Sequence, residues 1–202
     1  MKTQLKSLLA IAVAVSLGLG FTSCKNDEPE PGPSPTPTEK SYVFNNSICF
    51  NTQLTEICDI TIEYTDLEGK TTTANAKDLP TKSVAFTDMY GKAYEYTVHT
   101  FDKKQTTKNL PSETSLKVTF KVNENRPTTG TFDSYVAPDI YVGVPGTKEG
   151  SWSALSKYDT SKFTSGIPLD NNERVDSYIS VLNKLYGSFV AKADKDGKLT
   201  VE

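Results

Sequence analysis

The feature that most constrains this chain is an alternation of apolar and polar side chains with a period of two, between residues 40 and 123. Neighbouring side chains of a β-strand point to opposite faces, so this period predicts strands with one buried face. The apolar positions are Tyr42, Phe44, Ile48 and Phe50, then Cys58, Ile60, Ile62 and Tyr64, then Tyr94, Tyr96 and Val98, and finally Leu116, Val118, Phe120 and Val122. Asp66–Gly69 carries turn residues and predicts a hairpin.

Several one-sided strands separated by Gly, Pro and Asp residues, with no helical period between them, indicate an all-β fold. We expect an antiparallel immunoglobulin-like β-sandwich. A closed β-barrel is the alternative, because both architectures need the same inward and outward alternation.

The stretch 127–169 is rich in Gly, Pro, Ser and Thr, and within it only Ile140–Val144 looks like a strand. A structureless loop of this length is unusual in a compact domain. We therefore expect the stretch either to pack over the sandwich or to build a binding surface.

Residues 170–187 predict one helix near the C-terminus. Asp170 and Glu173 have the spacing of a capping box, apolar residues follow at helical intervals, and Gly187 is a suitable terminator. Residues 188–201 predict a final hairpin around Asp194–Gly197. Residues 41–202 are thus expected to form a single β-rich globular domain.

The first residues have the pattern of a secretory signal peptide. Lys2 and Lys6 precede the apolar run Leu8–Phe21, which is shorter than the about 20 residues that span a bilayer. Cys24 follows this run almost at once. We therefore expect residues 1–23 to be removed.

Phe21-Thr22-Ser23-Cys24 resembles the lipobox of bacterial lipoproteins, with Phe at the position that is more often Leu. This resemblance implies cleavage before Cys24 and acylation of Cys24 with diacylglycerol and an amide-linked fatty acid such as palmitate. A plain secreted protein with a chance cysteine is the alternative. Two or more acyl chains give stable membrane anchoring.

The acidic cluster 25–30 resembles the export signal of Bacteroidota (Bacteroides-like) surface lipoproteins. It implies a protein on the outer membrane that faces the cell exterior, and a periplasm-facing protein is the alternative. Residues 24–40 are rich in Pro and are expected to form an extended tether.

The charge balance excludes one class of partner. The formal net charge is −3 for the whole chain and becomes −5 when residues 1–23 are removed, and no segment is rich in Lys or Arg. Nucleic-acid binding requires a basic patch that displaces counterions. We therefore expect no nucleic-acid partner.

The sequence offers little for catalysis. His99 is the only histidine, it is expected to be exposed on a strand, and no nucleophile motif accompanies it. Asp194–Gly197 lacks the remaining ligands of a calcium loop, and Gly143–Gly146 lacks the strand-to-helix setting of a phosphate-binding loop. We expect no enzyme activity, no cofactor and no metal site.

Cys49 and Cys58 lie at the facing ends of two predicted strands and are candidates for a disulfide. The alternative is a pair of buried thiols that act as small apolar side chains.

The strongest functional candidates are aromatic residues of the stretch 127–169, because flat rings stack on sugar faces and nearby carboxylates bond to hydroxyls. The candidate set is Trp152, Tyr141, Tyr158 and Tyr135, with Asp133 and Asp139. The alternative is a satellite core under a long loop. Trp152 and Tyr141 exposed side by side would favour ligand binding, whereas burial of both, with an apolar sheet edge left open, would favour a protein partner.

These features together predict a non-enzymatic binding or interaction module of the cell envelope, held to the membrane by its lipid anchor. It would bind a glycan or serve as an accessory of a surface uptake complex. The alternative is a structural or assembly lipoprotein that contacts another envelope protein through a sheet edge or through the helix 170–187.

Overall fold

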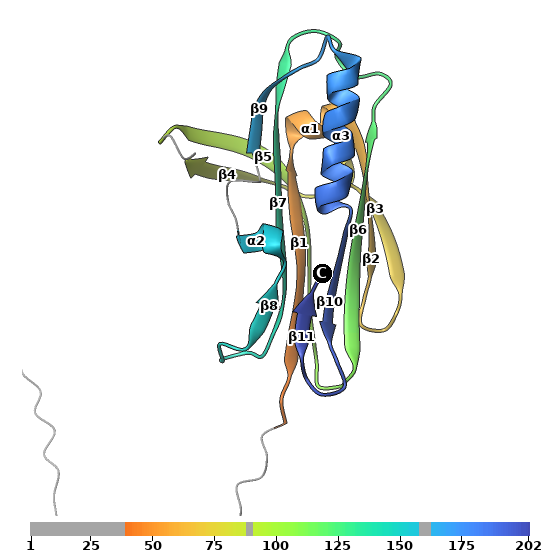
Figure 1. Ribbon diagram of the computed structural model, residues 1–202, viewed down its shortest axis with the longest axis vertical. Coiled ribbons are helices and arrows are strands. Elements are labelled where there is room, and N and C mark those ends of the chain that lie inside the picture. Colours follow the sequence, from red (N-terminus) through yellow and green to blue (C-terminus); the bar gives the residue numbers. More distant parts are fainter. Residues whose placement is uncertain (1–38, 88–90, 158–162) are drawn as a thin grey trace, which may run out of the picture. The chain divides into compact units, whose positions relative to one another are not determined.

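Two antiparallel sheets face each other in the computed structural model, which describes residues 39–87, 91–157 and 163–202 (Figure 1). Sheet A has the strand order β4 (Thr81–Thr87), β5 (Ala93–Thr107), β1 (Tyr42–Asn51), β7 (Thr131–Gly143) and β8 (Gly150–Trp152), and β9 (Phe163–Pro168) also pairs with β7. Sheet B has the order β11 (Leu199–Val201), β10 (Ser188–Ala193), β6 (Ser112–Val122), β2 (Cys58–Thr65) and β3 (Thr71–Asn75). The predicted antiparallel sandwich is confirmed, and two separate sheets take the place of the closed-barrel alternative.

The chain separates into two units, Met1–Pro37 and Thr38–Glu202, and the sandwich belongs to the second. The predicted signal peptide, Cys24 and nearly all of the predicted tether lie outside the described residues, as does Tyr158. The hydrophobic core that the described residues form lies within Thr38–Glu202. This unit therefore contains the contacts of its own core and is suitable for study as a separate protein.

The alternation in the sequence places the core between the sheets. Phe50 of β1 meets Phe120 of β6 edge-on, with ring centroids 5.8 Å apart. Tyr64 of β2 meets Phe101 of β5 at 5.7 Å. The fully buried Asn46 adds one polar link, since its Nδ2 donates to Thr114 Oγ1 of sheet B at 2.9 Å. Each contact joins the two sheets, so the inward faces hold the sandwich together.

The stretch 127–169 differs from its prediction. In place of a long irregular segment with one short strand, it contains all of β7, which is 13 residues long, together with β8, the short helix α2 (Ala154–Lys157) and β9. Pro138 argues against a strand in the sequence, because proline cannot donate a hydrogen bond to a strand ladder. Pro138 is tolerated because it falls between the residues of β7 that pair with β8 and those that pair with β9.

Both predicted hairpins are confirmed. In the turn between β2 and β3, Asp66 Oδ1 accepts from the N–H groups of Glu68 and Lys70. In the turn between β10 and β11, Asp194 Oδ1 accepts in the same way from Asp196 and Lys198. A glycine with positive φ follows each aspartate, at Gly69 and Gly197, as such tight turns require.

Short helices connect the strands. α1 (Thr52–Ile57) joins β1 to β2, and the 3₁₀ turn η1 (Ala76–Asp78) follows β3. The predicted C-terminal helix is α3 (Asn172–Tyr186), but its cap is Asn171, whose side chain accepts from Arg174 N, and not Asp170. None of the helices in the described ranges is both long and apolar enough to cross a bilayer.

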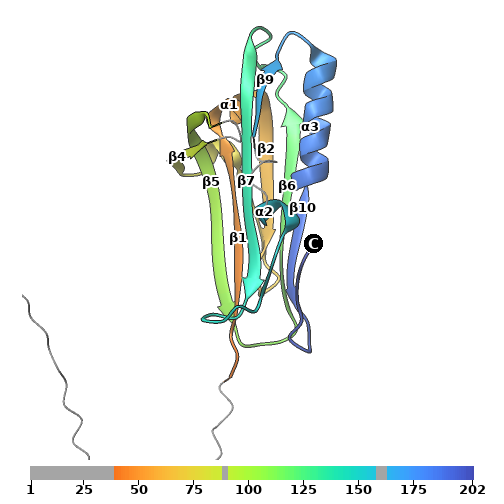
Figure 2. The same ribbon diagram turned by 60° about the vertical axis from the view of Figure 1, so that its left-hand side comes forward.

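α3 takes the place of a strand beside β6. It continues the line of β10 along the upper half of β6 in both views (Figures 1 and 2), and β10 itself pairs only with Ser112–Lys117. Asn183 replaces the missing ladder, because its side chain accepts from Phe120 N at 2.9 Å and donates to Phe120 O at 2.8 Å. A helix side chain thus satisfies the backbone of an otherwise open strand edge.

The candidate disulfide is wrong. Cys49 and Cys58 are not joined by a disulfide, and both are buried. Cys49 lies on the outer face of sheet A, where its thiol donates to Ala137 O at 3.7 Å, whereas Cys58 begins β2 within the core of the sandwich. The helix α1 separates the two strand ends, so the alternative interpretation of two buried thiols describes them.

We predict that Asn183→Leu lowers the free energy of unfolding of residues 38–202 by about 1–3 kcal/mol, because it leaves the N–H and C=O of Phe120 without their partner. Urea unfolding followed by circular dichroism measures this difference. Ser180→Ala, on an exposed position of the same helix, is the control and is expected to stay within about 0.5 kcal/mol. Equal unfolding midpoints for Asn183→Leu and the unmodified protein would contradict the role given to Asn183.

We also predict that neither thiol of residues 38–202 reacts with a disulfide reagent such as DTNB at pH 8 in the folded state, while both react after unfolding in guanidinium. Burial raises the pKa of the Cys58 thiol to about 12, so the reactive thiolate is scarce. The raised pKa also means that Cys58 stabilises the fold below its unfolded pKa of about 8.5, and that this contribution disappears as the pH rises toward 12. Rapid labelling of one thiol under native conditions would show that the α1 region opens.

Candidate ligand-binding site

The outer face of sheet A gathers most of the residues singled out in the sequence. Asp133, Tyr135, Asp139 and Tyr141 are alternate residues of β7, and all of them lie on the face opposite the buried Val136 and Ile140. Trp152 of β8 is directly opposite Tyr141 in the antiparallel register. The structure therefore brings five of the six candidates onto one face, and the sixth, Tyr158, lies outside the described residues.

Tyr141 and Trp152 form a tilted aromatic pair. Their ring centroids are 4.6 Å apart and their planes are inclined by 34°. Trp152 is 41% exposed, one of three large apolar residues with this exposure in the described part of the chain, while Tyr141 is half-buried. This pair, Tyr141 with Trp152, is called the platform below.

The platform has glycine beneath it. Gly143 and Gly150 face each other in the register of β7 and β8. The Tyr141 ring occupies the space in which a side chain at either position would begin. The ring therefore leans over the glycine backbone.

Polar side chains adjoin the platform on the next strand. Asn45 of β1 is directly opposite Tyr141. Its Nδ2 donates to the backbone oxygen of Asp139 at 2.8 Å and to Asp139 Oδ2 at 3.1 Å. Lys104 of β5, which is exposed, is the next residue across the sheet. Amide, carboxylate and ammonium groups thus stand beside the rings, where they can bond to the hydroxyls of a stacked ligand.

A second group of aromatic residues lies on the same face at the other end of β7. This aromatic cluster consists of Phe86, Tyr94, Tyr96, Tyr135 and Phe163. Phe86 is central, with ring centroids 5.3 Å from Tyr94 and 5.2 Å from Tyr135 in stacked geometry. The cluster lies at the end of β1. Its rings connect the hairpin β4–β5, which reaches out from the body in Figure 1, with β7 and β9.

Asp133 belongs to this cluster as a structural residue. Its Oδ2 accepts from the Tyr96 hydroxyl at 2.9 Å and its Oδ1 accepts from Gly166 N at 3.1 Å. Burial, reinforced by the bond to Asp133, raises the pKa of the Tyr96 phenol. Asn51 adds a further clamp, since its side chain donates to Asp133 O and accepts from Tyr135 N. For Tyr135 and Asp133 the satellite-core interpretation therefore describes the contacts.

In the part of the chain that the structure describes, potential metal ligands do not gather, and His99 lies beside a backbone carbonyl. His99 is half-buried instead of fully exposed, and its Nδ1 is 3.4 Å from the carbonyl oxygen of Leu79. Within residues 39–87, 91–157 and 163–202, no three His, Cys, Asp or Glu side chains are grouped as metal ligands.

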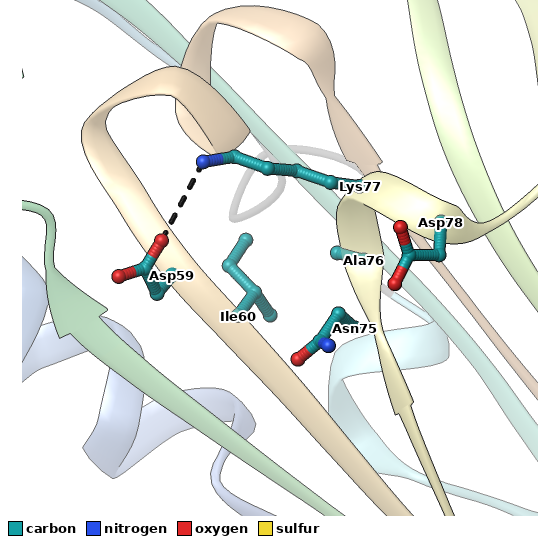
Figure 3. Close-up of a pocket in the computed structure, with 6 residues that line it drawn as sticks. All are labelled: Asp59, Ile60, Asn75, Ala76, Lys77 and Asp78. Atoms are coloured by element: carbon teal, nitrogen blue, oxygen red, sulfur yellow. Dashed lines mark hydrogen bonds and ion pairs between the residues drawn. The ribbon is translucent and has the colours of Figure 1, made fainter.

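One hollow of about 400 Å³ lies on the other sheet, at the edge of β2 beyond the end of β3 (Figure 3). It is lined by Asp59, Ile60, Asn75, Ala76, Lys77 and Asp78. Lys77 Nζ approaches Asp59 Oδ1 at 3.5 Å across its mouth, and both side chains are about half exposed. Such an exposed ion pair contributes little, and no aromatic ring lines the hollow, so the platform offers the better ligand site.

Comparison with known proteins adds no homologue. No protein-family model, no curated protein and no solved structure matches this chain.

We predict that Asp133→Asn lowers the pKa of Tyr96 toward the ordinary tyrosine value, because a neutral amide replaces the charged carboxylate that accepts a hydrogen bond from the Tyr96 hydroxyl. A phenol whose pKa is raised by folding stabilises the folded state below about pH 10 and loses that contribution as the pH rises. The free energy of unfolding of the variant should therefore depend less on pH above pH 10 than that of the unmodified protein. NMR titration of tyrosine labelled at Cζ measures the pKa. Tyr64, whose pKa burial raises to about 12, is the internal control, and an unchanged Tyr96 would contradict the assignment.

Proposed function

We propose that this protein is a non-enzymatic binding module of the cell envelope that holds a glycan on the platform of Tyr141 and Trp152. The observation that supports the proposal best is the exposure of Trp152, 41%, in a ring pair whose members are 4.6 Å apart. A contiguous exposed apolar surface, here made of two adjacent rings, is the kind of feature that marks an interaction site.

The chemistry of the platform fits a sugar. The faces of a pyranose ring carry C–H bonds, which pack on aromatic rings, while its hydroxyls point outward from the rim. Asn45 and Asp139 stand beside Tyr141 at this rim position and offer an amide and a carboxylate for hydroxyl groups. Aromatic contact would supply the affinity, and the polar pair would supply the orientation.

The N-terminal sequence supports the proposed location in the cell envelope. Cleavage before Cys24, acylation of Cys24 and an extended tether of residues 24–40 would display the sandwich from the outer membrane. The acidic cluster 25–30 favours the cell exterior, where polysaccharides are encountered, and there the module would serve a surface uptake complex as an accessory. We propose that the protein comes from a Bacteroides-like bacterium.

We predict that residues 38–202 bind at least one oligosaccharide on a glycan array and that Trp152→Ala abolishes this binding without a change in melting temperature. The ring is largely on the surface, so its loss removes ligand contact and little of the core. Leu185→Ala is the matched control, since Leu185 is equally exposed at 43% but lies on α3. Loss of binding in Trp152→Ala together with unfolding, or no binding by the unmodified protein, would contradict the proposal.

A second candidate function is docking of another envelope protein on α3. Val181 and Leu185 are one turn apart on this helix, and each is 43% exposed. Two exposed apolar side chains at positions i and i+4 form a ridge of the kind that partner helices or grooves cover. A glycan array without any hit for the unmodified protein would favour this candidate.

A further inference from the structure

Gly143 and Gly150 have no backbone reason to be glycine. Neither adopts a positive φ, unlike the glycines of the turns, so any residue fits the backbone at both positions. Glycine inside a strand weakens it, because it costs more conformational entropy and has no side chain to pack. The explanation must therefore lie in what surrounds the two residues.

What surrounds them is the Tyr141 ring. A Cβ added at Gly143 would overlap the hydroxyl oxygen and Cζ of Tyr141. A Cβ added at Gly150 would lie 2.5 Å from Tyr141 Cε2 and 3.2 Å from Trp152 Cη2. Any side chain at either position would therefore force the ring of Tyr141 to move, and at Gly150 it would also crowd Trp152.

We propose that Gly143 and Gly150 are the positioning residues of the platform. This inference rests on the proposed function, and it names the residues that determine the orientation of the Tyr141 ring. The two glycines leave space at the sheet surface that the Tyr141 ring occupies, and Trp152 packs against that ring. With a larger residue at either position, the tyrosine ring would stand away from the sheet and lose its contact with Trp152.

The orientation also limits the class of ligand. The tilted ring pair of the platform lies along the sheet, and Trp152, 41% exposed, offers a ring face to a ligand. The ligand that fits is a pyranose whose hydroxyls are all equatorial, because both of its faces then present C–H bonds. We therefore expect a β-linked glucan to bind, with its hydroxyls toward Asn45 and Asp139.

The test uses Gly143→Ala and Gly150→Ala in residues 38–202, with cellohexaose as the probe. Trp152 is the only tryptophan of the chain, so its fluorescence reports on the platform alone. In each variant we expect the emission to shift to longer wavelength, quenching by acrylamide to increase, and the affinity for cellohexaose to fall about tenfold or more. Melting temperatures should stay close to that of the unmodified protein, because alanine suits a strand better than glycine.

Tyr141→Ala provides the background that separates positioning from a general effect of the substitution. In that background, Gly143→Ala should leave both the emission and the quenching unchanged, because the ring that it displaces is absent. Unchanged Trp152 emission on adding Gly143→Ala to the unmodified protein would overturn the positioning role. If the unmodified protein does not bind cellohexaose, the β-glucan assignment fails, while the fluorescence comparison still decides the role of the glycines.

Discussion

The antiparallel pairing of β1 with β7 is the contact on which the rest of the structure depends. It sets Phe50 against Val136 and Asn45 against Tyr141, so it decides at once which side chains enter the core and which reach the outer face. A shift of one residue would turn every side chain of β7 to the opposite face. The buried Val136, Ile140 and Val142 therefore fix the register, and the platform and the aromatic cluster follow from it.

In sheet B, β6 is longer than the neighbouring strand β10, so part of its edge needs another partner. β10 covers only the first part of β6, and α3 covers the rest with Asn183 bonded to Phe120. The start of α3 is fixed by the buried Arg126, which donates to the carbonyl of Leu169 and to the side chain of Asn172. A helix at this position protects a strand edge from pairing with another chain, and it leaves only Val181 and Leu185 as large exposed apolar residues on its outer side.

The sequence predicts the strands wherever their alternation is uninterrupted, as in β1, β2 and β6, and it predicts the hairpins from Asp and Gly. It fails in β7, because Ser134 and Pro138 occupy inward positions where apolar residues are expected. The candidate residues Tyr141, Trp152 and Asp139 were found from composition, since aromatic residues and carboxylates are visible in any sequence. Asn45, Gly143 and Gly150 were missed, because their roles arise from cross-strand register between segments far apart in the chain. The aromatic cluster around Phe86 was not predicted for the same reason, since its rings come from strands far apart in the chain.

The two aromatic groups on sheet A show why residue type alone does not identify a binding site. In the aromatic cluster the rings lie against one another, with Asp133 and Asn51 bonded beneath them, so each ring contributes to closing the sheet beyond the end of β1. In the platform the rings lie over glycine, and the outer ring is open to solvent. Stability alone would favour a β-branched residue at Gly143 and a polar residue at Trp152. A place where two local rules are broken together, at neighbouring positions of one surface, is where function is to be sought.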